Sequence, residues 1–596
     1  MMDEGRRWAA AARAGAALLV GSMVVRILAP MFARLDRFGF HDWDAHSVYR
    51  WSTVASVRDY GEAPWWNPWQ CGGYPSWGFA EGATNFVSPY LPIYLAFPLQ
   101  VAERLEVLGS AIVLAVGTYL LAGRFTNSRA LRALAVVAGA LNGRWALQTA
   151  VGHTWHLQYA WLPFAFWGLD VAIEERRASH AIIAGAALAA MVYAGGIYPL
   201  PHAALALVLY ASLVAALRRS TQPLVQLGIA AATGVGLAAP KLFAIADTMT
   251  RAPRLVDSTE AIGPRELLRM LTSRDQWFYS RPFDLHGWPW HEYGIYVGWT
   301  GVAVLAGGLL LAHRTKREVA LAVTAGILLL LGFGAFHRFA PWSLLHHVPP
   351  FASQRVPTRF LYPASMLLSI AFAAAAGRLL RQRLADVRWL DAALLVPVAV
   401  FAVDVASIDV ESLEHPFRLT MPRLPDKASF RHASSAVVTY VEADEMPHAL
   451  LPSAMANQGV ISCYGVGETT SGAIAADAPS YRGEAYVAEG SGAARVVSWS
   501  PSSAVVEIAG ANAGAIVVYN MSFDPSWRAN DAPAIEWHGA VATQVGAGEK
   551  RVSFTYRPRT LNAGLAIAGM TMLVLAGVAR RARRRGNVAG KAKILS

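Results

Sequence analysis

The chain has few cysteines and few charged residues for its length. Only Cys71 and Cys463 occur among its 596 residues, and neither has the spaced histidine partners of a zinc site. Charged residues make up 15% of the chain and hydrophobic residues 55%, a balance that excludes an ordinary soluble protein. The sequence therefore predicts a polytopic α-helical membrane protein.

Basic residues exceed acidic ones, and the excess lies in short loops. The chain has 52 Lys and Arg against 40 Asp and Glu, which gives a formal net charge of +12. Much of the excess falls in the loops 124–132, 174–180, 218–219, 313–318, 378–388 and 580–585. The positive-inside rule, which keeps Lys and Arg on the cytoplasmic side, accounts for such loops. No basic face is interleaved with base-stacking aromatic residues, so we expect no nucleic-acid partner.

Apolar runs of about 20 residues, the length that crosses the hydrocarbon core, predict the topology. The predicted spans number about twelve: 14–33, 106–124, 131–150, 155–173, 180–198, 201–217, 224–246, 295–313, 318–336, 360–378, 388–406 and 561–579. This threading puts the basic loops and both termini on the cytoplasmic side. The apolar run 88–99 contains prolines and is too short to span, so we interpret it as re-entrant or interfacial.

Four long segments then face the outer side: 34–105, 247–294, 337–359 and 407–560. Apolar residues alternate with polar ones in the last segment, a period-two pattern that predicts a β-rich, sandwich-like domain. We therefore divide the chain into a membrane domain over 1–406, an outer β domain over 407–560, and a last span with a basic tail over 561–596. Both cysteines lie on the outer side, where a disulfide is allowed, but we expect them to be unpaired.

The first outer loop begins with Asp42 and Asp44, beside His41 and His46. On a strand the two aspartates would share a face, whereas on a helix they would diverge. Either could act as a general base toward an acceptor hydroxyl, or hold a divalent cation such as Mg²⁺ or Mn²⁺ together with a histidine. Alternatively, they cap the next helix. Glu81, later in the same loop, could hydrogen-bond a ligand.

Other candidate substrate-binding residues lie in the outer-side turns. His153 and His156 are three residues apart and could share a helix face that binds phosphate or metal, or they could be ordinary interfacial histidines. Glu292 ends a Trp-rich outer loop. Arg355 and Arg359 precede an inbound span, and a guanidinium can bind two phosphate oxygens at once. These arginines lie on the predicted outer side, where the positive-inside rule does not account for them. We therefore expect them to bind an anionic lipid or a phosphate.

Several short runs occur in a particular order along the chain: the acidic first outer loop, NPWQCGGYP, EYGIYVG, RVPTRF before a late helix, and SFDPSWRAN before the last span. In these runs and their order the chain resembles the GT-C-fold membrane glycosyltransferases. Within that class it most resembles the bacterial YfhO family. The resemblance implies an enzyme of the bacterial inner membrane that takes a sugar from a polyprenyl-phosphate carrier. The acceptor on the outer face would be a glycan, a lipid or a protein.

The resemblance also implies that a first-loop aspartate is the base. Asp44 is slightly preferred to Asp42 because it lies further from the membrane exit of the first helix. No second acidic motif is recognisable, so no metal is assigned. Two other functions stay open. A transporter or flippase of an envelope lipid or glycan usually has polar groups at mid-span, and few are present here. A non-catalytic envelope-assembly protein would use the β domain to recruit partners.

Overall fold

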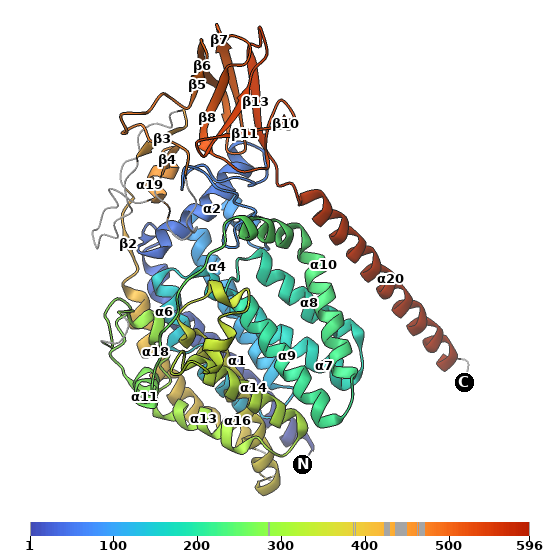
Figure 1. Cartoon of the computed structure of the whole chain (residues 1–596). Coiled ribbons are helices and arrows are strands. Elements are labelled where there is room, and N and C mark those ends of the chain that lie inside the picture. The colour runs from blue at the N-terminus through green and yellow to red at the C-terminus, as the bar shows by residue number, and fades with distance from the viewer. Residues whose placement is uncertain are drawn as a thin grey trace.

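Helices form the main body of the protein, and strands lie at one end of it (Figure 1). The computed structural model describes residues 2–283, 287–384, 387, 389–421, 429–434, 450–461, 463 and 471–594, with side chains for those between 6 and 580. The two termini lie toward the end of the helical body that is away from the strands. The side of the membrane on which the two ends lie stays a prediction.

Eight helical segments of the described chain are long and apolar enough to cross a membrane. They are α1 (Met2–Ala33), α4 (Leu99–Ala122), α9 (Pro199–Arg218), α10 (Gln222–Arg251), α12 (Trp290–Tyr293) with α13 (Gly298–Leu311), η4 (Pro357–Phe360) with α16 (Leu361–Arg383), α17 (Leu390–Ala393) with α18 (Leu395–Glu414), and the start of α20 (Leu561–Ile594). By length and composition the chain is a multi-pass membrane protein.

The other four predicted spans are short or broken helices. Residues 131–150 form α5 (Arg129–Ala135), a π-helical turn (Val136–Ala140) and α6 (Gly143–Val151), and residues 155–173 begin as the 3₁₀ helix η2 (Thr154–Trp161) before α7 (Leu162–Glu175). The helices α8 (Ala178–Tyr193) and α14 (Lys316–Gly332) have 16 and 17 residues. At about 1.5 Å per residue they are shorter than the roughly 30 Å core. The count of twelve therefore stays a prediction.

The predicted C-terminal β region is present. Its strands are β5 (Ala485–Glu489), β6 (Ala493–Ser500), β7 (Ser503–Ala509), β8 (Ile516–Ser522), β9 (Trp527–Ala529), β10 (Ala532–Pro533), β11 (Ile535–Trp537), β12 (Ala540–Gln544) and β13 (Arg551–Tyr556). They form two antiparallel sheets, ordered β10-β9-β13-β7-β6 and β11-β12-β8-β5. Tyr519 of β8 stacks on Phe554 of β13 with ring centroids 5.7 Å apart. The two sheets therefore pack face to face around one apolar core.

The first outer loop fastens the β region to the helices. The Ser522 amide donates to the Gly72 carbonyl at 2.9 Å, and a disulfide joins Cys71 to Cys463. Our expectation of unpaired cysteines was therefore wrong. The two cysteines are 392 positions apart in the chain, so only the folded structure brings them together.

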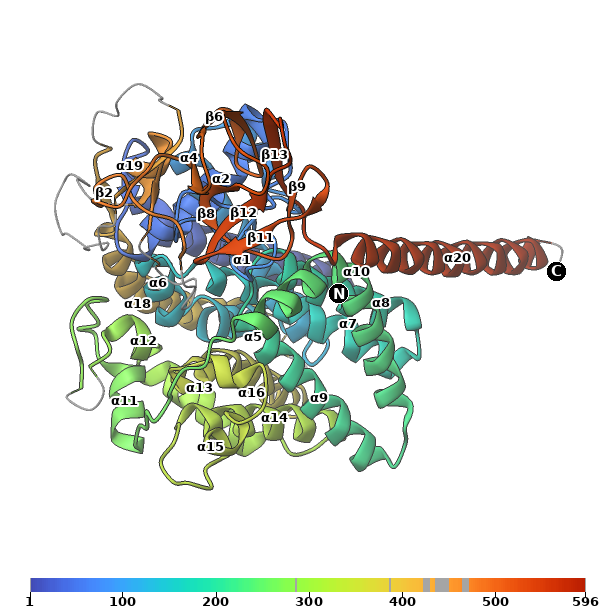
Figure 2. The same cartoon turned by 45° about the horizontal axis from the view of Figure 1, so that its top comes forward.

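The last helix stands apart from the others. Figure 2 shows α20 extending away from the rest of the protein, and it packs mainly against α10. At Gly564 a side chain would collide with Pro240 of α10, because a Cβ there would lie 2.6 Å from the Pro240 Cα. The glycine lets these two helices approach closely where α20 begins.

Candidate active site

A cavity of about 570 Å³ opens beside the first turn of α2 (Asp42–Asp59). Its lining comes from seven parts of the chain and consists of Asp42, His46, Tyr49, Glu81, His153, Trp155, Tyr198, Pro253, Arg254, Leu255, Val256, Arg355, Arg359 and Cys463. Six of the nine predicted site residues belong to this lining. The other three, Asp44, His156 and Glu292, lie around it.

Asp42 is fixed by two histidines. Its Oδ2 lies 2.7 Å from His153 Nε2, and its Oδ1 lies 3.1 Å from His41 Nδ1. Burial alone would raise the pKa of Asp42, but the charge of His41 and the hydrogen bonds from both histidines hold it well below its usual value. Asp42 is therefore a permanently ionised carboxylate in the cavity wall.

Asp44 points elsewhere. Its carboxylate accepts hydrogen bonds from the amides of Leu450 (2.7 Å) and Leu451 (2.9 Å), where the short helix α19 (Leu450–Met455) begins. Burial raises its pKa to about 6, although these two amides act in the opposite direction. The two aspartates diverge because they lie on a helix, which is the geometry that the helical alternative predicts. Asp44 anchors a distant segment and does not reach the cavity.

His46 and Glu81 form the wall next to Asp42. His46 Nδ1 lies 2.8 Å from Thr154 Oγ1, and its Nε2 lies 3.8 Å from Glu81 Oε1. Burial lowers the pKa of His46 to about 3, and burial raises the pKa of Glu81 to about 7. At neutral pH His46 is therefore an uncharged imidazole beside a carboxyl group that can exchange its proton.

Arginines also line the cavity. Arg359 donates through Nε to Glu292 at 3.0 Å and through Nη2 to the other oxygen of the same carboxylate, and its guanidinium lies 4.1 Å from the centre of the Tyr198 ring. Arg355 stacks on Trp288 at 4.5 Å, and its buried Nε has no partner among the described residues. Glu292 thus holds Arg359 in place from behind the cavity. Cationic side chains fixed by aromatic rings are suited to bind an anion.

Arg254, which follows the end of α10 and lines the same cavity, was not among the predicted site residues. It lies in the outer segment 247–294, so the criterion that selected Arg355, a basic residue against the positive-inside trend, would have found it. Tyr49, Trp155 and Tyr198 were missed for a different reason. They belong to helices that the sequence gives no reason to place around one cavity.

His156 lies outside the cavity lining. Both of its ring nitrogens are buried without a partner in the described chain, and the rings of Tyr159 and Tyr362 lie 4.9 and 4.6 Å away. The predicted i, i+3 pairing with His153 does not bring the two histidines to one ligand, because the 3₁₀ turn places only His153 against Asp42.

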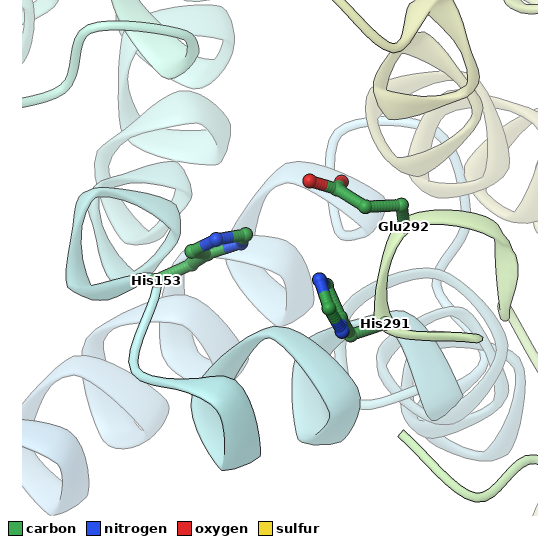
Figure 3. A group of neighbouring side chains, drawn as sticks. All are labelled: His153, His291 and Glu292. Atoms are coloured by element: carbon green, nitrogen blue, oxygen red, sulfur yellow. The ribbon is translucent and has the colours of Figure 1, made fainter. Parts of the chain in front are cut away.

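His153, His291 and Glu292 come close enough to hold a metal ion, with one ligand atom of each within 4.8 Å of the others (Figure 3). His291 suits this role, because its Nδ1 lies 2.8 Å from the Phe278 carbonyl and its Nε2 is left for a ligand. Both oxygens of Glu292, however, are bound by Arg359, and the His153 nitrogens face Asp42 and Gln148 Oε1. As arranged, the trio does not fit a divalent cation, and the chemistry below uses none.

No protein-family model matches the chain, and no curated protein gives a significant match. Among solved structures, the arabinofuranosyltransferase AftD from Mycobacteria is similar with a TM-score of 0.44 and 15% identity, over 74% of this chain and 32% of that one. The oligosaccharyltransferase AglB from Archaeoglobus fulgidus, solved with an inhibitory peptide and a dolichol-phosphate, has a TM-score of 0.37 and 13% identity, over 74% and 64%. The chain spans less than two thirds of either. TM-scores below 0.5 do not establish a shared fold.

Proposed function

We propose that the chain is a membrane glycosyltransferase of the GT-C type, which transfers a sugar from a polyprenyl-phosphate donor to an envelope acceptor. The observation that carries the proposal is one cavity lined both by Arg254, Arg355 and Arg359 and by the carboxylates of Asp42 and Glu81. Anion-binding groups and carboxylates in one cavity are what transfer from a phosphate-linked sugar to a hydroxyl requires.

The arginines would hold the donor phosphate. As the bond between the anomeric carbon and the phosphate oxygen breaks, its electron pair goes to that oxygen and the lipid phosphate gains negative charge. Guanidinium groups therefore bind the transition state more tightly than the ground state, which accelerates the reaction. Aromatic rings help to keep both cations in position, and the ring beside Arg355 does so without neutralising its charge.

A carboxylate in the same cavity would take the proton of the acceptor hydroxyl. Of the two first-loop aspartates, Asp42 lines the cavity and stays the proposed catalytic residue. Asp44 has no carboxylate oxygen directed into the cavity, since the α19 amides donate hydrogen bonds to both of its oxygens. We therefore assign Asp44 a structural role.

We place the reaction on the outer face of a bacterial inner membrane, with both termini in the cytoplasm. The basic loops on the side of the termini support this orientation. In this arrangement the β region lies outside. Because α18 continues to Glu414, we propose that the outer domain begins after this residue, slightly later than the sequence suggested.

The proposal predicts different outcomes for a matched pair of variants, Asp42→Asn and Asp44→Asn. The purified protein is reconstituted in liposomes with undecaprenyl phosphate linked to radiolabelled glucose, mannose or arabinose, and with an octyl glycoside as acceptor. We expect the wild type to transfer label from one of these donors, and Asp42→Asn to lose transfer by at least a hundredfold. Asp44→Asn keeps transfer but unfolds at a lower temperature, because its hydrogen bonds to α19 weaken.

Two results would contradict this assignment. If both single variants and the double variant transfer at the wild-type rate with normal membrane levels, neither aspartate is catalytic. If labelled lipid or glycan crosses the bilayer while no glycosidic bond forms, the protein is a transporter instead.

A further inference from the structure

The two carboxylates of the cavity have opposite surroundings. Each oxygen of Asp42 faces a histidine nitrogen, at 2.7 and 3.1 Å. The carboxylate of Glu81 accepts no hydrogen bond from the described residues, and its nearest cationic or imidazole nitrogen is His46 Nε2 at 3.8 Å. A base needs a free lone pair directed at the proton that it takes. Glu81 meets this requirement better than Asp42.

One tautomer of His46 fits the hydrogen bonds around its ring. Arg50 Nη1 donates to Thr154 Oγ1 at 3.1 Å, so the hydroxyl hydrogen of Thr154 is free to point at His46 Nδ1, 2.8 Å away. Nδ1 is then the acceptor, and the ring hydrogen of the neutral imidazole lies on Nε2, toward Glu81. His46 thus presents a weak donor to the Glu81 carboxylate without giving it a charged partner.

The loop that carries Glu81 is held against α10. Lys241 donates its Nζ to the Gly82 carbonyl at 2.7 Å, and Trp77 donates its Nε1 to the Pro240 carbonyl at 2.9 Å. Lys241 binds the backbone next to Glu81 and makes no hydrogen bond to its carboxylate in the described chain. The side chain is therefore placed by its backbone and stays open to the cavity, with 12% of its surface exposed.

We propose that Glu81 is the general base of the reaction and that Asp42 is the fixed negative charge beside the anomeric carbon. The inference rests on the proposed function. The acceptor O–H bond breaks and its proton goes to the Glu81 carboxylate, while the acceptor oxygen bonds to the anomeric carbon. The sugar–phosphate bond breaks in the same step and its electrons leave with the lipid phosphate. Asp42 stabilises the positive charge that develops on the sugar ring.

The acid–base properties of the two groups agree with this division. A carboxylate whose pKa is held well below normal, as in Asp42, is a poor base but a constant charge. Burial raises the pKa of Glu81 to about 7, which suits proton exchange at neutral pH. Among the described residues, the charged and titratable groups that act on Glu81 are Arg254, Asp42, Arg359, Arg50, His46 and Lys241.

The test compares Glu81→Gln with Asp42→Asn in the liposome assay described above. We expect Glu81→Gln to lower kcat by about 10²- to 10⁴-fold, the usual contribution of a general base. The wild-type rate rises with pH through about 7, because the Glu81 carboxyl must first lose its proton. This rise persists at a lower rate in Asp42→Asn and disappears in Glu81→Gln.

Chemical rescue separates a base from a merely structural residue. Formate added to Glu81→Ala should restore at least a tenth of the wild-type rate, since the cavity has room for it, and should not rescue Asp42→Ala. If Glu81→Gln transfers within threefold of the wild type, or keeps the pH-dependent rise, the assignment is overturned. If the Glu81 variants do not fold, a wild-type rate that is flat between pH 5.5 and 8.5 overturns it equally. A wild type that transfers nothing refutes the proposed function itself.

Discussion

At the scale of single residues, the cavity arginines differ in how much of their charge is available. Arg359 binds both oxygens of Glu292 through two of its nitrogens, so this pair is close to neutral. Arg355 contacts only the face of an aromatic ring at its guanidinium and leaves a buried Nε without a partner in the described chain. We infer that Arg355 gives the larger electrostatic contribution to phosphate binding, and that Arg359 mainly positions the donor.

Replacing Arg355 should therefore weaken the use of the donor strongly. In Arg355→Gln we expect kcat/KM for the lipid-phosphate sugar to fall by about tenfold to a hundredfold, because a hydrogen bond to a charged group contributes about 1.5–3 kcal/mol. Arg495→Gln is the matched control, since Arg495 lies exposed on β6 and its ion-pair partner among the described residues is Glu507 on β7. Equal kcat/KM values for the two variants would show that Arg355 does not contact the donor.

The sequence could indicate which residue types form the site, but not which of two neighbours would reach it. The motif that contains Asp42 and Asp44 predicts a carboxylate at the first outer loop, and one is there. Only Asp42 lines the cavity, because the carboxylate of Asp44 binds the amides of Leu450 and Leu451. These amides are about 400 positions away, and no local pattern encodes that contact. The role of Glu81 depends in the same way on Thr154 and His46, which lie in separate segments.

At the scale of elements, the long apolar helices and the C-terminal strands were predictable because their periodicity is local. The helix breaks in residues 131–173 could not be predicted in this way. They occur where Asn142 caps α6 and where the chain forms the 3₁₀ helix η2 beside the cavity. Helix ends and irregular turns depend on tertiary partners, and these are the places where the site residues lie.

At this scale, the disulfide between Cys71 and Cys463 can be tested most directly. Cys71→Ser and Cys463→Ser should each lower the thermal midpoint of unfolding by the same amount, and the double variant should lower it no further. A native disulfide typically contributes about 2–4 kcal/mol, and the three variants lose the same bond. The wild type with its disulfide reduced should unfold at the same temperature as the variants. Additive losses in the double variant would mean that each cysteine stabilises the protein separately.

At the scale of the whole molecule, ion pairs hold the β region on the helices. Arg251, in the last turn of α10, donates to Asp524 of the β region at 2.7 Å and to Asp247 of its own helix at 2.9 Å. Asp524 is almost fully buried. A charge that is buried at such a junction is stable only while its partner remains.

Arg251→Gln should therefore loosen the junction without unfolding either part. We expect a cost of about 1–2 kcal/mol, since Arg251 is itself partly exposed. Limited chymotrypsin digestion of the reconstituted protein, in which neither substitution removes a cleavage site, should release the β region faster than in the wild type. Arg557→Gln, which removes an exposed arginine near α20, is the control. Identical digestion rates in both variants would show that the ion pair does not secure the junction.

The contact between Asp44 and Leu450 also sets the order of events while the protein is made. Leu450 leaves the ribosome 406 residues after Asp44, which at about 5–20 residues per second is a delay of roughly 20 to 80 seconds. Throughout this interval the segment around Asp44 lacks the amides that bind its carboxylate, and Cys71 lacks its partner. A nascent chain therefore completes both long-range links only while its last quarter is being synthesised.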